Sequence, residues 1–324
     1  MYNYREFSIR VVTLAATLAL AGLVQAPAAP QHPSPPATSP SNGEGGSRQL
    51  QGAAPTEAEL HARAEKLISH QHRDDNEIEQ FDLIERHMDR TGGPSSRVIG
   101  DKTYRVVPTG SGTLKILLKD GTTPTDPADY RRQLQSWEML LQSMLGGDNS
   151  KSKTELDKYE RRKRERAEFI DAIGRAFLVK PLGQETCDGR VCDVFDLYPN
   201  PAYRPHSMFQ DALTHVTAKI WVDRESDQLA RGEAHITHDI SFGGGILGKL
   251  YRGGTVAMEQ TEVAPGIWLP KRYQYDFAGR RFFFSFDQHQ VVEATHYRRI
   301  GPPSEALAVV QNELANGKLT SVDP

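Results

Sequence analysis

Two neighbouring stretches decide the fold: residues 267–277, IWLPKRYQYDF, and residues 281–295, RFFFSFDQHQVVEAT. Both are rich in aromatic and β-branched residues, and their apolar side chains fall mostly on alternate positions, which is the period of a β-strand. Short connections link them to further strand-like runs at 219–223, 230–240 and 255–263. Successive strands joined by short turns predict an antiparallel meander.

Helical patterns precede and follow this meander. Residues 126–145 carry an apolar stripe that includes Leu134, Trp137 and Leu141 and repeats every three or four positions, as expected for a helix packed on a sheet. Residues 57–92 keep a similar spacing from Leu60 to Met88, so we expect two amphipathic helices or one kinked helix there. Strands are predicted at 102–107 and 112–118, and a closing helix at 304–316. The fold class is therefore α+β, with a curved antiparallel sheet over helices.

The segment 151–168 is strongly charged, with eight Lys or Arg and five Asp or Glu. It could contact anionic lipid or nucleic acid. Acidic and basic residues alternate at helical spacing, which favours a solvent-exposed helix face with local ion pairs. The net charge of −3 also argues against a nucleic-acid binder held by overall basic charge.

The amino terminus has the pattern of an export signal. Arg5 and Arg10 precede an apolar run at 11–24, which at 14 residues is shorter than the ~20 needed to span a bilayer. We expect a signal peptide at 1–28 with cleavage near Ala28, and a periplasmic or secreted protein without a transmembrane span after cleavage; an uncleaved anchor is the alternative. Residues 29–56, rich in Pro, Gly and Ser, predict a disordered tether.

Two cysteines, Cys187 and Cys192, enclose the sequence DGRV. In a hairpin with a four-residue loop they would face each other closely enough for a disulfide, which an oxidising compartment allows. If Asp188 and Gly189 form a two-residue turn instead, the cysteines miss direct pairing and stay as thiols. The bridge is the favoured alternative, as a hairpin clip without a redox role.

Motifs for catalysis, metals and cofactors are weak. Residues 243–250, GGGILGKL, resemble phosphate-binding loops, but Leu250 stands where a hydroxyl should hold magnesium. We interpret the glycine-rich segment as a flexible lid loop, formed by Gly243, Gly244, Gly245, Ile246 and Leu247. His235 and His238 fall in a strand-like run whose alternation places them on opposite faces. The sequence thus predicts no catalytic residue, no metal site and no cofactor.

The aromatic residues of the carboxy-terminal strands are the most informative feature for function. Alternation would gather them into a broad apolar lining on one face of the sheet. That lining could be buried completely against the helix at 126–145 or could form a ligand-binding cavity. The candidate ligand-binding residues are Trp221, Trp268, Tyr275, Phe282 and Phe284.

Several segments carry a resemblance to a known family, among them KDGTTPTDPADYRRQ (119–133), TAKIWVDRESDQLARGEA (217–234) and GIWLPKRYQYDF (266–277). They resemble exported bacterial proteins with the fold of the outer-membrane lipoprotein-sorting carrier and receptor, the LolA/LolB-like proteins. The resemblance covers residues 98–300 and implies a half-open antiparallel barrel whose apolar interior receives acyl chains. The helical segment at 57–92, the tether and the carboxy-terminal helix and tail at 301–324 lie outside it.

These observations lead to one functional hypothesis and two alternatives. We expect an exported, non-catalytic binder or carrier of a lipid or lipoprotein acyl chain in the bacterial envelope, with envelope proteins as further partners and no nucleic acid. The first alternative is a structural or interaction protein of the envelope with a filled core. The second is a metal-dependent envelope hydrolase that uses scattered His and Asp side chains.

Overall fold

The computed structural model of this chain describes residues 56–93, 95–109, 113–145, 150–242, 244–245, 248–301 and 305–316. The expected signal peptide at 1–28, its cleavage point near Ala28 and nearly all of the tether at 29–56 lie outside these residues. Within them, no helix is both long and apolar enough to cross a membrane.

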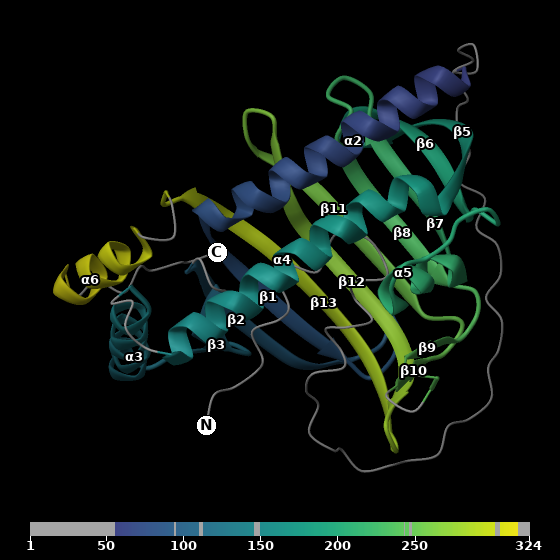
Figure 1. The fold of residues 1–324 in the computed structure, drawn as a ribbon. Helices are drawn as coiled ribbons and strands as arrows, with labels where there is room; N and C mark the ends of the chain where they lie inside the picture. Colours follow the sequence, from purple (N-terminus) through teal and green to yellow (C-terminus); the bar gives the residue numbers. More distant parts are fainter. Residues whose placement is uncertain are drawn as a thin grey trace.

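The centre of the fold is one large antiparallel sheet that curves but does not close (Figure 1). Its strands follow the order β4-β3-β2-β1-β13-β12-β11-β8-β7-β6-β5, and β10 with its partner β9 pairs to β12 off this path. The strands are β1 (Phe81–Arg90), β2 (Val98–Pro108), β3 (Thr113–Asp120), β4 (Thr123–Pro124), β5 (Phe177–Cys187), β6 (Arg190–Pro199), β7 (Val216–Asp223), β8 (Leu229–Ile236), β9 (Ile240–Phe242), β10 (Gly248–Leu250), β11 (Thr255–Ala264), β12 (Ile267–Arg281) and β13 (Phe284–Arg299). The α+β fold class and the antiparallel meander expected from the sequence are confirmed.

Four longer helices accompany the sheet: α2 (Glu57–Glu77), α3 (Pro127–Leu145), α4 (Ser150–Ala176) and α6 (Ala306–Asn316). The short helix α5 (Met208–Ala212) and the single 3-10 turns η1 (Ile78–Gln80) and η2 (Leu213–His215) complete the described helices. Thr56 begins α2 with a capping box, because its hydroxyl accepts from the Glu59 amide and the Glu59 carboxylate accepts from the Thr56 amide. α2 and α4 cross the sheet side by side, whereas α3 and α6 pack together beside β3 (Figure 1).

The two largest apolar clusters of the described residues follow from this arrangement. The larger one, here called the interior cluster, lies between the sheet and the helices α2 and α4; its sheet residues come mainly from β6, β7, β8, β11 and β12. The smaller one joins β2 and β3 to α3 and α6 through residues such as Val107, Ile116, Tyr130 and Val310. The stripe on α3 therefore packs against β3 and α6, apart from the interior cluster.

The expectation of helix throughout 57–92 is wrong after Gln80. Residues Phe81–Arg90 form β1, which lies between β2 and β13 in the sheet. The first five residues of β1 are buried on both faces, so the apolar residues there lack the alternation that marks a half-exposed strand. Phe81, Ile84 and Met88 fit helical spacing by coincidence.

Candidate functional site

The interior cluster presents an apolar wall to the helices that cover it. On β7 the alternate residues Val216, Ala218, Ile220 and Val222 belong to it, as do Tyr273, Tyr275 and Phe277 on β12. Tyr275 and Phe277 stack with their ring centres 5.5 Å apart. Each buried residue of this cluster has at most 8% of its surface exposed.

Only one of the five predicted ligand-binding aromatics, Tyr275, lies in the interior cluster. Ile220 and Val222 both point inward, so strand alternation turns Trp221, between them, to the other face. Trp221 and Trp268 share a separate cluster with Cys192, Val194 and Ala230.

Trp221 and Trp268 are held by polar neighbours in this separate cluster. The Arg231 guanidinium lies 4.7 Å from the Trp221 ring centre, and that of Arg190 lies 5.2 Å from the Trp268 ring centre. The Trp221 indole N–H donates to Glu185 Oε2 at 2.8 Å. Both indoles are buried, with 5% and 3% of their surfaces exposed.

The other two predicted residues, Phe282 and Phe284, lie outside the interior. Phe282 is in the turn between β12 and β13, and Phe284 begins β13 opposite Arg281. They are 45% and 73% exposed. The single lining that strand alternation predicted is therefore divided among three places on the molecule.

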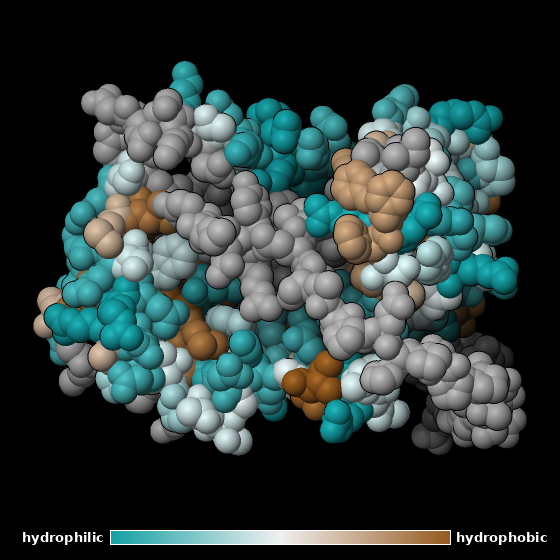
Figure 2. All heavy atoms as spheres, turned by 90° about the horizontal axis from the view of Figure 1, so that it is seen from below, coloured by the Kyte–Doolittle hydropathy of each residue, from teal (hydrophilic) through white to brown (hydrophobic). Residues whose placement is uncertain are grey.

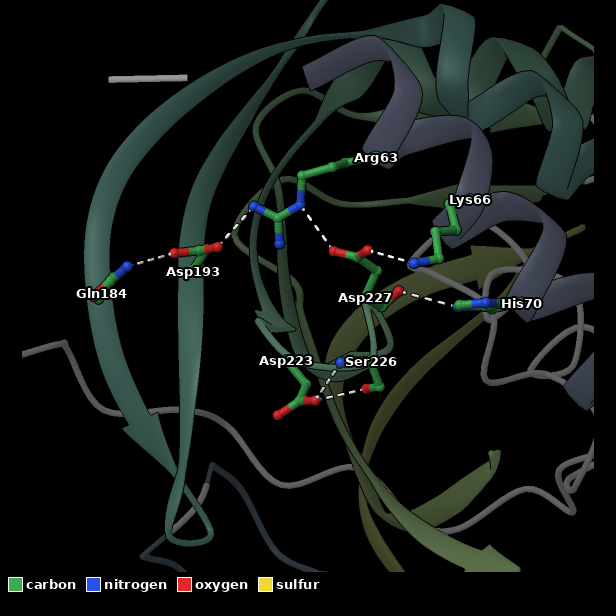
Figure 3. Close-up of polar contacts among 8 residues, drawn as sticks. All are labelled: Arg63, Lys66, His70, Gln184, Asp193, Asp223, Ser226 and Asp227. Carbon is green, nitrogen blue, oxygen red and sulfur yellow. Dashed lines mark hydrogen bonds and ion pairs between the residues drawn. The ribbon is translucent and has the colours of Figure 1, made fainter. Parts of the chain in front are cut away.

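The outer half of α2 is fastened to the sheet by a group of charged residues, here called the clasp (Figure 3). Arg63 donates through Nε to Asp227 Oδ1 at 2.9 Å and through Nη1 to Asp193 Oδ2 at 2.7 Å. Lys66 Nζ donates to Asp227 Oδ2 at 2.8 Å. His70, one helical turn further along, has its Nδ1 3.2 Å from the Asp227 carbonyl oxygen. One face of α2 is thus tied to β6 and to the turn between β7 and β8.

Residues of the sheet and of its turns fix the positions of the two acids of the clasp, Asp193 and Asp227. Gln184 on β5 donates to the second oxygen of Asp193 at 3.0 Å. Asp227 sits in the β7–β8 turn with φ of 54°, a left-handed conformation that Asp adopts more readily than most residues. In the same turn Asp223 Oδ2 accepts from the Ser226 amide at 2.9 Å and from its hydroxyl at 2.6 Å (Figure 3).

The Asp227 carboxylate of the clasp is ionised at neutral pH. Burial alone would raise the pKa of Asp227, but the hydrogen bonds from Lys66 and Arg63 outweigh it and the pKa lies below its ordinary value. Burial lowers the pKa of His70, which keeps that imidazole neutral. Within the clasp, the cations that hold α2 are therefore Arg63 and Lys66.

α2 makes few apolar contacts with the interior cluster compared with its polar contacts to the sheet. Leu60 and Leu67 are its residues that pack, partly buried, against the interior cluster. At its inner end Gln71 donates to Gln260 at 3.3 Å, and Arg73 donates to the Gly266 carbonyl. α2 is thus a cover with two apolar contacts beneath and polar attachments at both ends.

A second polar group, on β1 and β3, lies beside the interior. Glu85, which is fully buried, has its Oε2 2.7 Å from His87 Nε2 and 3.0 Å from Lys115 Nζ. Burial would raise the pKa of Glu85, but Lys115 and His87 outweigh it. Burial, followed by the charge of Glu85, raises the pKa of Tyr273 in the interior cluster. Sequence reasoning missed this group because β1 was predicted as helix.

Cys187 and Cys192 are free in the structure, contrary to the disulfide that the sequence favoured. Asp188 and Gly189 form a two-residue turn with φ of 47° and 80°, so Cys187 pairs with Arg190 and Cys192 with Glu185. The cysteines are therefore diagonal rather than direct neighbours. Burial raises the pKa of both thiols.

The expected lid loop joins β9 to β10. Gly244 and Gly245 form its turn with φ of 64° and 85°, and Gly243, Ile246 and Leu247 lie outside the described residues. His215 and His238 have ring centres 6.2 Å apart, but within the described ranges no three His, Cys, Asp or Glu side chains are grouped as metal ligands would be.

Comparison with solved structures finds several that are similar to this chain, and three of them are as follows. No family model matches the sequence, and no curated protein matches it. A putative outer-membrane lipoprotein-sorting protein domain of Vibrio parahaemolyticus is 10% identical, with a TM-score of 0.30 over 72% of this chain and 92% of that one. A LolA superfamily protein of Nitrosomonas europaea is 13% identical, with a TM-score of 0.28 over 73% and 91% of the two chains.

The third neighbour is a DUF1329 family protein of Desulfovibrio piger, which is 13% identical with a TM-score of 0.28 over 74% of this chain and 92% of that one. The first two neighbours are of the kind that the sequence resembles.

Proposed function

We propose that this protein is an exported, non-catalytic carrier that holds an apolar ligand, a lipid or a lipoprotein acyl chain, between the apolar wall and α2. The observation that supports it is a difference in polarity between the apolar wall and the face of α2 that covers it. The wall is apolar across several strands, and Phe169, Ala172 and Ala176 of α4 cover part of it. The described side chains of α2 bring Leu60 and Leu67 against it, and α2 is otherwise attached through polar and charged groups.

This mismatch makes α2 a removable cover. The clasp is partly exposed, so water can replace its hydrogen bonds when α2 moves away from the rim. An alkyl chain that takes the place of Leu60 and Leu67 then loses water against the interior cluster, which contributes ~0.8 kcal/mol per buried methylene. The turn that carries Asp227 stays in place and allows the cover to close again.

The test is uptake of a fluorescent apolar probe, N-phenyl-1-naphthylamine, by the folded protein. We expect Leu67→Asp, which places a charge on the underside of α2, to weaken probe binding about tenfold or more, because a carboxylate resists transfer into apolar surroundings. Met139→Asp, at a position 65% exposed on α3, is the matched control and should bind the probe like the wild type.

Two results would contradict the proposal. One is failure of the folded wild type to take up the probe or to carry lipid when isolated from its own envelope. The other is equal uptake by Leu67→Asp. Either result would favour the alternative of an interaction protein whose core is filled by its own side chains.

A further inference from the structure

The turn between β12 and β13 presents three consecutive phenylalanines to solvent. Phe282, Phe283 and Phe284 are 45%, 92% and 73% exposed, and they follow directly after Arg280 and Arg281. These three phenylalanines are here called the aromatic tip. Exposed large apolar side chains that lie next to one another mark an interaction site rather than ordinary surface.

The aromatic tip lies on an arm that extends past the neighbouring strands. β12 and β13 have 15 and 16 residues, but β11 pairs with β12 only as far as Asp276, and β1 pairs with β13 only as far as Gln290. Beyond those positions the hairpin has β10 as its neighbour, through Gly279, Arg280 and Arg281. In Figure 1 the tip lies at the lower end of the molecule and α2 at the upper end. Figure 2 looks at that lower end and shows a group of apolar side chains among polar ones.

The backbone conformation of the turn indicates that the phenylalanine side chains have a function. Phe282 has φ of 50°, in the left-handed region where Gly or Asn would fit with less strain. Arg281 and Phe284 pair across the turn, so two residues connect the strands, and such turns favour small residues with positive φ. A bulky aromatic residue at a strained position is typical of a functional site.

The charges around the tip select the partner. Arg280 and Arg281 precede the aromatic tip. Lys249 lies opposite Arg280 on β10, where it forms an ion pair with Asp239 at 2.8 Å. The nearest acid of the hairpin, Asp287, is 2.8 Å from His289 Nε2. Aromatic side chains beside cations suit the boundary of a bilayer with anionic head groups, where rings enter the acyl region and guanidinium groups meet phosphates.

We propose that the aromatic tip docks this protein onto the surface of an anionic lipid bilayer by inserting Phe282, Phe283 and Phe284 at the headgroup level. This docking surface is separate from the interior cluster and does not depend on what the interior holds. The protein would then have two different lipid sites. The aromatic tip would contact the bilayer surface, and the interior would hold a single apolar chain.

The first test measures binding of the full chain to vesicles of phosphatidylcholine with about one third phosphatidylglycerol. We expect the triple variant Phe282→Asn, Phe283→Ser, Phe284→Ser to bind at least about tenfold more weakly, because the rings supply the apolar area that is buried. The double variant Ile99→Ser, Met139→Ser removes two apolar side chains that are 60% and 65% exposed elsewhere, and should bind like the wild type. Circular dichroism checks that each variant is folded.

The second test reports on the tip alone. The apolar run at 11–24 is common to all variants, so a local probe separates its contribution from that of the hairpin. In Phe283→Trp the added fluorescence should shift to the blue and be quenched by vesicles whose acyl chains are brominated, whereas in Met139→Trp it should not.

Three outcomes would overturn the proposal: absence of quenching at position 283, equal vesicle binding by the triple variant, and equal wild-type binding to vesicles of phosphatidylcholine alone. Sedimentation analysis provides a fourth outcome that would overturn the proposal. A wild-type dimer that the triple variant abolishes, without vesicle binding, would assign the tip to a second copy of this chain.

Discussion

Arg63 on α2 and Asp227 in the β7–β8 turn are hydrogen-bonded at 2.9 Å although 164 residues separate them. The same guanidinium reaches Asp193 on β6, so one side chain joins the helix to two separate parts of the sheet. The position of α2 over the interior thus depends on a few charged contacts that can be changed one at a time.

Replacing Arg63 by Gln should loosen α2 while leaving the sheet intact. The variant removes two charge-assisted hydrogen bonds from a partly exposed site, which we expect to lower the free energy of opening α2 by about 1–2 kcal/mol. Hydrogen exchange measures this directly, as a rise of about tenfold in the exchange rates of amides in Glu57–Glu77.

Arg131→Gln, at an exposed position on α3, is the control for the loss of one positive charge. Added salt should speed exchange in wild-type α2 and have less effect in Arg63→Gln, because screening acts on the contact that the variant lacks. Unchanged exchange in Arg63→Gln would mean that α2 is held by other contacts.

Asp74, near the end of α2, should make stability fall as pH rises. Burial raises its pKa to about 6 despite the opposing effect of Arg73. An acid whose pKa is higher in the folded than in the unfolded protein binds more protons when folded. Its stabilising effect is therefore complete below about pH 4 and is lost as pH rises through 6.

We expect Asp74→Asn to be more stable than the wild type at pH 7.5, by up to about 2 kcal/mol, with the difference vanishing near pH 4. Urea unfolding at both pH values measures the difference. Comparing the two proteins at each pH cancels the contributions of the other titrating groups. A difference that is independent of pH would contradict the assignment to Asp74.

The two cysteines should behave as unreactive thiols. Cys192 is fully buried and Cys187 partly so, and burial raises the pKa of each, which leaves little thiolate to react. Titration with Ellman's reagent should detect two thiols per chain in denaturant and only slow reaction in the native protein at pH 8. If denaturant revealed no thiols, the chain would contain the hairpin disulfide that the cysteine spacing suggests.

Local patterns predicted the elements whose environment is uniform along their length. The stripe from Tyr130 to Leu141 predicted α3 because one side of that helix faces a core throughout. The strand-like runs at 219–223 and 255–263 likewise predicted β7 and β11. β1 was missed because its first half is buried on both sides, so no period of two remains to be read.

The candidate site was less predictable because it depends on contacts between distant segments. Nothing local links Arg63 to Asp193 or Asp227, which lie 130 and 164 residues away. The aromatic residues were assigned to one face by counting alternate positions, but a register shift near Gln260 and a turn at Phe282 both break that count. Alternation within one strand does not carry across a bulge or around a hairpin.

The pairing of β1 with β13 has a consequence for how the molecule reaches its final form. Asp82 and Arg298, joined across this pair, are 216 residues apart, and both strands lie inside the sheet rather than at its edge. β1 and β13 cannot pair until nearly the whole polypeptide is present. A chain still being synthesised therefore lacks its central pairing, and the sheet is completed only when synthesis is nearly finished.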